Sequence, residues 1–80
     1  MNPDNIDLTI ARVLVDARNK AGLTQIQAAE RLDMSQPGLA HWESGNRSIR
    51  IADLPKIADA YGIHPLRLLR KIFENPKNKA

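Results

Sequence analysis

The chain has 80 residues, with 12 Lys and Arg against 9 Asp and Glu, and is therefore one small, mildly basic domain with a formal charge of +3. It contains no cysteine, and its two histidines, His41 and His64, lie far apart, so we expect neither a disulfide framework nor a metal or other cofactor. Because no apolar run approaches the roughly 18 residues of a membrane span and the first residues are polar, we expect a cytoplasmic protein without membrane contact.

Apolar residues recur at helical spacing in five short segments, and none of these segments alternates as a strand would, so the fold should be all-α. The first helix is expected from about Ile6 to Ala21, with Gly22 supplying the left-handed stop. Its inward stripe comprises Ile10, Leu14, Ala17 and Ala21.

The second helix is expected from Thr24 to Leu32, because Gln27 three positions after Thr24 can complete a capping box. Asp33 should break the helix, since Asp tolerates left-handed backbone better than most residues, and Met34 beside it should be buried.

The third helix is expected from Ser35 to Ser44, because Pro37 is tolerated in a first turn, where a missing amide has no partner. Leu39 and Trp42 should point inward, and Gly45 should end the helix.

A fourth helix should begin near Ala52 and end at Tyr61, which we expect in the core with its hydroxyl at the surface. A fifth should have Pro65 at its first position. Residues 1–74 would form the domain, and residues 75–80 are expected to be a disordered basic tail.

The second and third segments describe a helix-turn-helix, in which the second helix can lie in the DNA major groove. Two helices that cross steeply need a small residue such as Ala29 between them. Taken alone, Ala28 and Ala29 are equally well explained as ordinary core alanines.

The stretch from Leu23 to Gly45 resembles the helix-turn-helix signature of the phage-repressor and Cro class, and the likeness extends from about Leu14 to Leu69. The residues that carry it are Leu23, Thr24, Gln25, Ala29, Leu32, Met34, Ser35, Leu39, Trp42, Glu43 and Gly45. The resemblance implies a compact five-helix, lambda-repressor-like DNA-binding domain. It also implies a homodimer on a palindromic operator. We expect a transcriptional regulator, with repression as the first expectation and activation left open.

Residues that open the two helices are DNA contacts in that family, and here they are Gln25, Ser35 and Gln36. Gln25, with Thr24 before it, can hold a phosphate at a helix amino end. Gln36 can make paired hydrogen bonds to adenine, although it can also be a solvated first-turn residue.

Four further positions of the third helix bear on base reading. His41 should share the outward face and can donate to guanine or a phosphate, or be a spectator. Ala40 can touch a thymine methyl, and Gly38 suggests close approach of backbone to DNA. Pro37 and Gly38 depart from the family's usual polar side chains, so specificity can depend more on DNA shape.

The loop after the third helix carries Asn46, Arg47, Ser48 and Arg50, whose family counterparts grip the phosphate backbone. Surface arginines in a loop are also often simply solvated. Arg18 and Glu43 match a buried or partly buried ion pair of the family, which we interpret as architectural.

No residue constellation indicates an enzyme. The alternative to a DNA-binding regulator is an antitoxin or another protein-interaction module on the same fold, with DNA binding for autoregulation. Its apolar patch, against a toxin for example, could comprise Phe73, Ile72, Ile26 and Ile49. A dimer interface is expected in the region of the fourth and fifth helices, with Leu68 and Ile72 as candidates.

Overall fold

Five α-helices make up the computed structural model of the chain, which describes residues 3–74. They are α1 (Pro3–Lys20), α2 (Gln25–Arg31), α3 (Gln36–Ser44), α4 (Leu54–Tyr61) and α5 (Pro65–Phe73). No strand occurs in this part of the chain, so the expected all-α class is confirmed. The expected tail from Asn75 lies outside the described residues.

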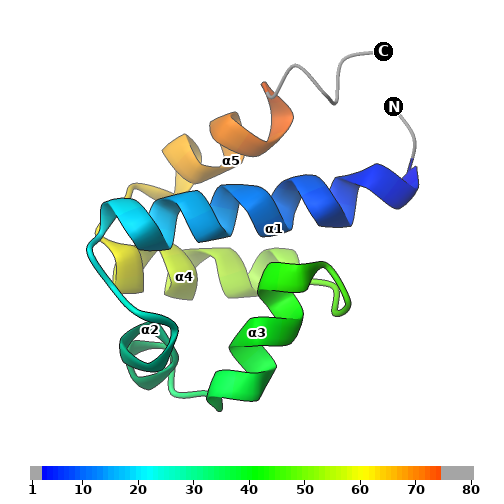
Figure 1. Cartoon of the computed structure of the whole chain (residues 1–80). Helices are drawn as coiled ribbons and strands as arrows, with labels where there is room; N and C mark the ends of the chain where they lie inside the picture. The colour runs from blue at the N-terminus through cyan, green and yellow to red at the C-terminus, as the bar shows by residue number, and fades with distance from the viewer. Residues whose placement is uncertain (1–2, 75–80) are drawn as a thin grey trace.

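The long helix α1 lies across the middle of the molecule and separates α5 from the pair α2 and α3 (Figure 1). It contacts both α3 and α5, while α4 contacts α5 and α2. The core between these helices contains six large side chains with less than 2% relative exposure: Leu14, Leu32, Leu39, Ile57, Leu68 and Ile72. No helix among the described residues is long and apolar enough to cross a membrane.

Local capping signals fix the start of α2. The hydroxyl of Thr24 accepts a hydrogen bond from the backbone of Gln27 at 3.1 Å, and the Gln27 side chain accepts one from the Thr24 amide at 3.0 Å. The predicted capping box is therefore confirmed. The helix ends where Asp33 adopts the predicted left-handed backbone, with a φ of 53°.

Removing the Thr24 hydroxyl should destabilise the domain measurably. We expect Thr24→Ala to lower the free energy of unfolding by about 1 kcal/mol, because one amide at the start of α2 loses its acceptor. The melting temperature should fall by roughly 4–8 °C. Thr24→Ser keeps the acceptor and is the control in the same calorimetric measurement. An equal loss of stability in both variants would show that the hydrogen bond of the Thr24 hydroxyl does not stabilise the domain.

Three expected features differ in the structure. Helix α1 begins at Pro3, three residues before the expected start. A 3-10 turn, Ile51–Asp53, precedes α4, so the α-helix starts at Leu54 rather than near Ala52. Met34 is half-buried rather than buried.

The position of Tyr61 also needs correction. The residue is in the core as expected, with 6% relative exposure. Its hydroxyl is buried as well, instead of reaching the surface, and has no hydrogen-bond partner among the described residues. The structure therefore places in the core a polar atom that has no partner within residues 3–74.

Candidate nucleic-acid interface

The amino end of α3 lies beside α2 at the edge of the molecule that is farthest from α5 (Figure 1). The Ser35 hydroxyl caps α3 by accepting a hydrogen bond from the Gly38 amide at 3.1 Å. Gln36, Pro37 and His41 are exposed, and Ala40 is half-buried. The expected contact residues of this helix, apart from Gly38, are therefore open to a ligand.

A chain of hydrogen bonds links the exposed start of α3 to the interior. The Gln36 side-chain amide donates to Gln25 Oε1 at 3.0 Å, and Gln25 Nε2 donates to Glu43 Oε1 at 2.9 Å. A carboxylate only accepts, so Glu43 determines which end of the Gln25 amide faces it. Gln25 consequently presents its oxygen to Gln36, and Gln36 keeps its own oxygen and one amide hydrogen unused by this pair.

The ion pair of Arg18 and Glu43 holds the inner end of this chain. Arg18 Nε donates to Glu43 Oε2 at 2.6 Å, and a second guanidinium nitrogen donates to Oε1 at 3.1 Å. A third Arg18 nitrogen donates to the Leu23 carbonyl at 2.8 Å. The two side chains are only 13% and 5% exposed. Arg18 thus ties α1 to α3 and to the segment that precedes α2.

Gly38 is buried, unlike its neighbours in the first turn of α3. A Cβ atom added there would lie 3.1 Å from Ser35 Oγ and 3.3 Å from the Met34 methyl group. The tight space around position 38 therefore favours a glycine for packing inside the protein. Burial makes packing the simpler reason for a glycine at position 38, and its base contact stays an untested prediction.

The loop after α3 carries the remaining predicted contacts. Asn46, Arg47, Ser48 and Arg50 are all exposed. The Ser48 hydroxyl donates to a carboxylate oxygen of Asp7 at 3.2 Å, and Arg50 lies 3.8 Å from Asp53. Two of the four residues are thus engaged within the protein, whereas no ion pair of Arg47 occurs among the described residues.

A comparison of the sequence with protein-family models supports the assignment of α2 and α3 to a helix-turn-helix. A family model described as helix-turn-helix, HTH_3, matches residues 14–68, which include all of α2 and α3. The chain belongs to this helix-turn-helix family. It is also 32% identical, over 72 residues, to the HTH-type transcriptional regulator ImmR of Bacillus subtilis (strain 168). The match covers 90% of this chain and 57% of that relative, so the chain spans little more than half of the relative's length.

Two apolar surfaces expected for this helix-turn-helix domain must be revised. Leu68 and Ile72, the candidates for a dimer interface, are 0% and 2% exposed and belong to the core. Of the apolar patch expected for a protein partner, Ile72 is buried and Ile49 is half-buried. Only Ile26 and Phe73 remain exposed, at 61% and 63%.

Sequence reasoning missed the hydrogen bonds that join Gln25 to Glu43 and Ser48 to Asp7. These pairs are separated by 18 and 41 positions, so no local spacing signals them.

Proposed function

We propose that the domain binds double-stranded DNA sequence-specifically, with the amino end of α3 in the major groove, and regulates transcription as a repressor. The observation that carries this proposal is the hydrogen-bonded pair of Gln25 and Gln36 at the exposed junction of α2 and α3. Holding Gln36 in one orientation before binding reduces the cost of ordering its side chain on DNA.

The orientation of Gln36 suits an adenine. Its free oxygen can accept from adenine N6 while its remaining amide hydrogen is donated to N7. Pro37 and Ala40 offer apolar surface for a thymine methyl group, and His41, one turn along the helix, can donate to guanine or to a phosphate. We assign these four residues to base reading.

Phosphate contacts would flank the reading helix on both sides. On one side are Thr24, Gln25 and Ser35, which lie at the start of α2 and α3. On the other side is the loop with Asn46, Arg47, Ser48 and Arg50. Such contacts position the domain without reading sequence. Arg47 is the strongest candidate because the residue is exposed and no ion pair of it occurs among the described residues.

Fluorescence anisotropy with random duplex DNA at two salt concentrations tests the proposal. We expect binding that weakens as salt increases, because each phosphate contact releases counterions. Absence of binding at low salt would contradict DNA binding altogether. Selection from a random oligonucleotide pool would then supply the operator.

Two variants separate base reading from phosphate binding on that operator. Gln36→Ala should lose about 1–3 kcal/mol of discrimination at one base pair, because the paired hydrogen bonds disappear. Arg47→Ala should weaken binding to all sequences and reduce the salt slope by about one unit. If Gln36→Ala weakened all sequences equally, Gln36 would not be a base-reading residue.

We further propose that two copies bind a palindromic operator, with their reading helices roughly 34 Å apart. Phe73, 63% exposed on α5, takes the place of the buried Leu68 and Ile72 as the apolar residue available for that contact. Sedimentation on operator DNA tests this, and one bound copy per full site would contradict it.

A further inference from the structure

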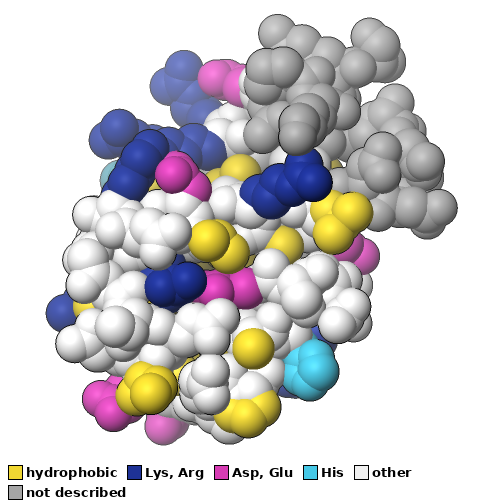
Figure 2. All heavy atoms as spheres, viewed as in Figure 1, with side chains coloured by type: hydrophobic (Ala, Val, Ile, Leu, Met, Phe, Trp, Pro, Cys, Tyr) yellow, Lys and Arg dark blue, Asp and Glu magenta, His cyan; other side chains and the backbone are white. Residues whose placement is uncertain are grey.

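A groove of about 820 Å³ lies between α1 and α5, away from the helix-turn-helix. Five of its lining residues are lysine or arginine, and only two, Asp16 and Glu74, are acidic. Figure 2 shows basic side chains gathered over α5 and the adjoining part of α1. The groove is thus a strongly basic concave surface.

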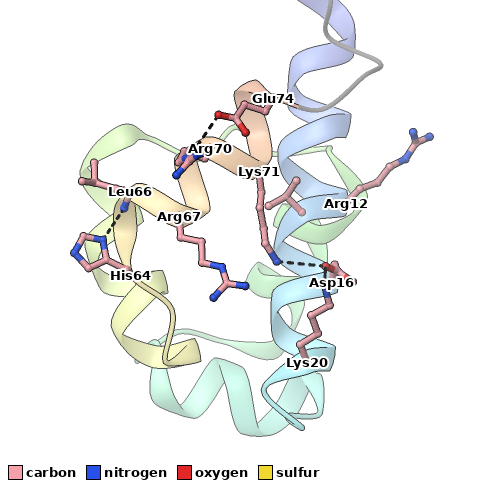
Figure 3. Close-up of a pocket in the computed structure, with 10 residues that line it drawn as sticks. Arg12, Asp16, Lys20, His64, Leu66, Arg67, Arg70, Lys71 and Glu74 are labelled. Carbon is pink, nitrogen blue, oxygen red and sulfur yellow. Dashed lines mark hydrogen bonds and ion pairs between the residues drawn. The ribbon is translucent and has the colours of Figure 1, made fainter.

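Both carboxylates of the groove are already engaged by its own cations (Figure 3). Asp16 lies 3.1 Å from Lys20 and 4.0 Å from Lys71, while Glu74 accepts a hydrogen bond from Arg70 at 3.3 Å. Arg67 extends from α5 toward α1, and no ion pair of Arg67 occurs among the described residues (Figure 3). The groove therefore retains positive charge that its own acids do not neutralise.

This arrangement of charges shifts the pKa values of two lysines in the groove. The hydrogen bond and the charge of Asp16 raise the pKa of Lys20. Burial lowers the pKa of Lys71, and the positive charge of Lys20 lowers it further. An additional negative charge in the groove would favour the charged form of Lys71.

The groove also has an apolar part. Val13 is buried on the α1 side, whereas Leu66 of α5 is 63% exposed at the groove. Phosphates are recognised by charge and hydrogen bonds and would leave the Leu66 side chain uncovered. Carboxylates combined with an apolar side chain fit the groove better.

The position of the groove separates it from the proposed DNA contacts, because α1 lies between α5 and the amino end of α3 (Figure 1). An occupant could therefore bind while α3 occupies a major groove. Residues 75–80 contain two lysines and no acidic side chain, so their side chains cannot supply the missing negative charge.

We propose that the groove between α1 and α5 binds an acidic segment of a partner protein, with carboxylates facing Arg67 and Lys71 and an apolar side chain against Leu66. Charges on both sides would steer association and fix the orientation of the segment. The interaction is independent of the DNA proposal, so each can fail without the other.

The probe is a fluorescein-labelled 12-residue peptide of glutamate and leucine, with leucines at helical spacing, and the measurement is anisotropy with the full chain. A peptide with lysine in place of glutamate is the charge control. Arg67→Glu should weaken binding of the acidic peptide by about tenfold or more, whereas Lys56→Glu, an equal charge reversal at an exposed site on α4, should change it little. Leu66→Ala should weaken it also, and Ile51→Ala, at a residue 77% exposed outside the groove, should not.

Amide chemical shifts of the chain locate the bound peptide, and we expect the shifts to change only in α1 and α5. The affinity of Arg67→Glu for the operator should equal that of the parent chain. No binding at low salt would overturn the proposal, as would equal effects of Arg67→Glu and Lys56→Glu. If duplex DNA displaced the peptide and Arg67→Glu weakened DNA binding as strongly, the groove would be a second phosphate-binding face instead. Circular dichroism of each variant checks that the fold is retained.

Discussion

Glu43→Gln should lower the free energy of unfolding by about 3 kcal/mol, and the melting temperature by roughly 12–24 °C. The substitution leaves the Arg18 guanidinium, which is 13% exposed, facing a neutral amide in place of the carboxylate that it holds at 2.6 Å. Removing one charge of a buried pair is costly, because the remaining charge has lost its water without keeping its partner. Urea unfolding followed by tryptophan fluorescence measures the difference.

The double variant Arg18→Met, Glu43→Leu distinguishes a stranded charge from lost packing. If the stranded charge is the cause, the double variant should be more stable than Glu43→Gln, because apolar replacement of both partners is often near neutral. A loss below about 1 kcal/mol for Glu43→Gln would indicate instead that the pair contributes no more than an exposed ion pair does.

The same substitution should affect DNA binding separately from stability. An amide at position 43 can donate as well as accept, so Gln25 is no longer restricted to presenting its oxygen to Gln36. At a temperature where the variant is folded, discrimination at the base pair that we propose Gln36 to read should decrease more than overall affinity does.

Much of the fold could be predicted because neighbouring residues in the sequence determine where most of its helices begin and end. The capping box of Thr24, the prolines in first turns and the left-handed Asp33 each depend on neighbouring residues, so the sequence alone indicates them. The start of α4 is different. A proline near the start of a helix is compatible with either a 3-10 or an α-helical turn before it, and the sequence does not choose between them.

The inward face of α5 could not be predicted from spacing. Leu68 and Ile72 recur at helical spacing, and so do Leu66 and Phe73, yet only the first pair is buried. Which face contacts α1 depends on how the helix docks, and that is decided by the whole core. For the same reason the sequence does not show the basic groove, because the residues that α1 contributes to it lie more than 40 positions from those of α5.

A final prediction concerns Tyr61, whose buried hydroxyl has no described hydrogen-bond partner. Tyr61→Phe removes this polar atom while it keeps the ring in the core. We expect the variant to be more stable than the parent chain by about 1 kcal/mol at neutral pH, because an unsatisfied buried donor is costly. Tyr61→Leu is the control, since it also removes the hydroxyl but leaves a cavity and should be destabilising.

The pH dependence of the parent chain tests the same interpretation in alkali. Burial, with a further contribution from the charge of Glu43, raises the pKa of Tyr61 to about 12, whereas an unfolded tyrosine titrates near 10. Between about pH 10 and 12 the unfolded chain has therefore lost a proton that the folded chain keeps, so stability decreases as pH rises through this range. The loss should approach about 2–3 kcal/mol and be absent from Tyr61→Phe. Since the chain has one tyrosine, phenolate absorbance reports this group alone, and a midpoint near 10 in the folded protein would show that the hydroxyl is solvated.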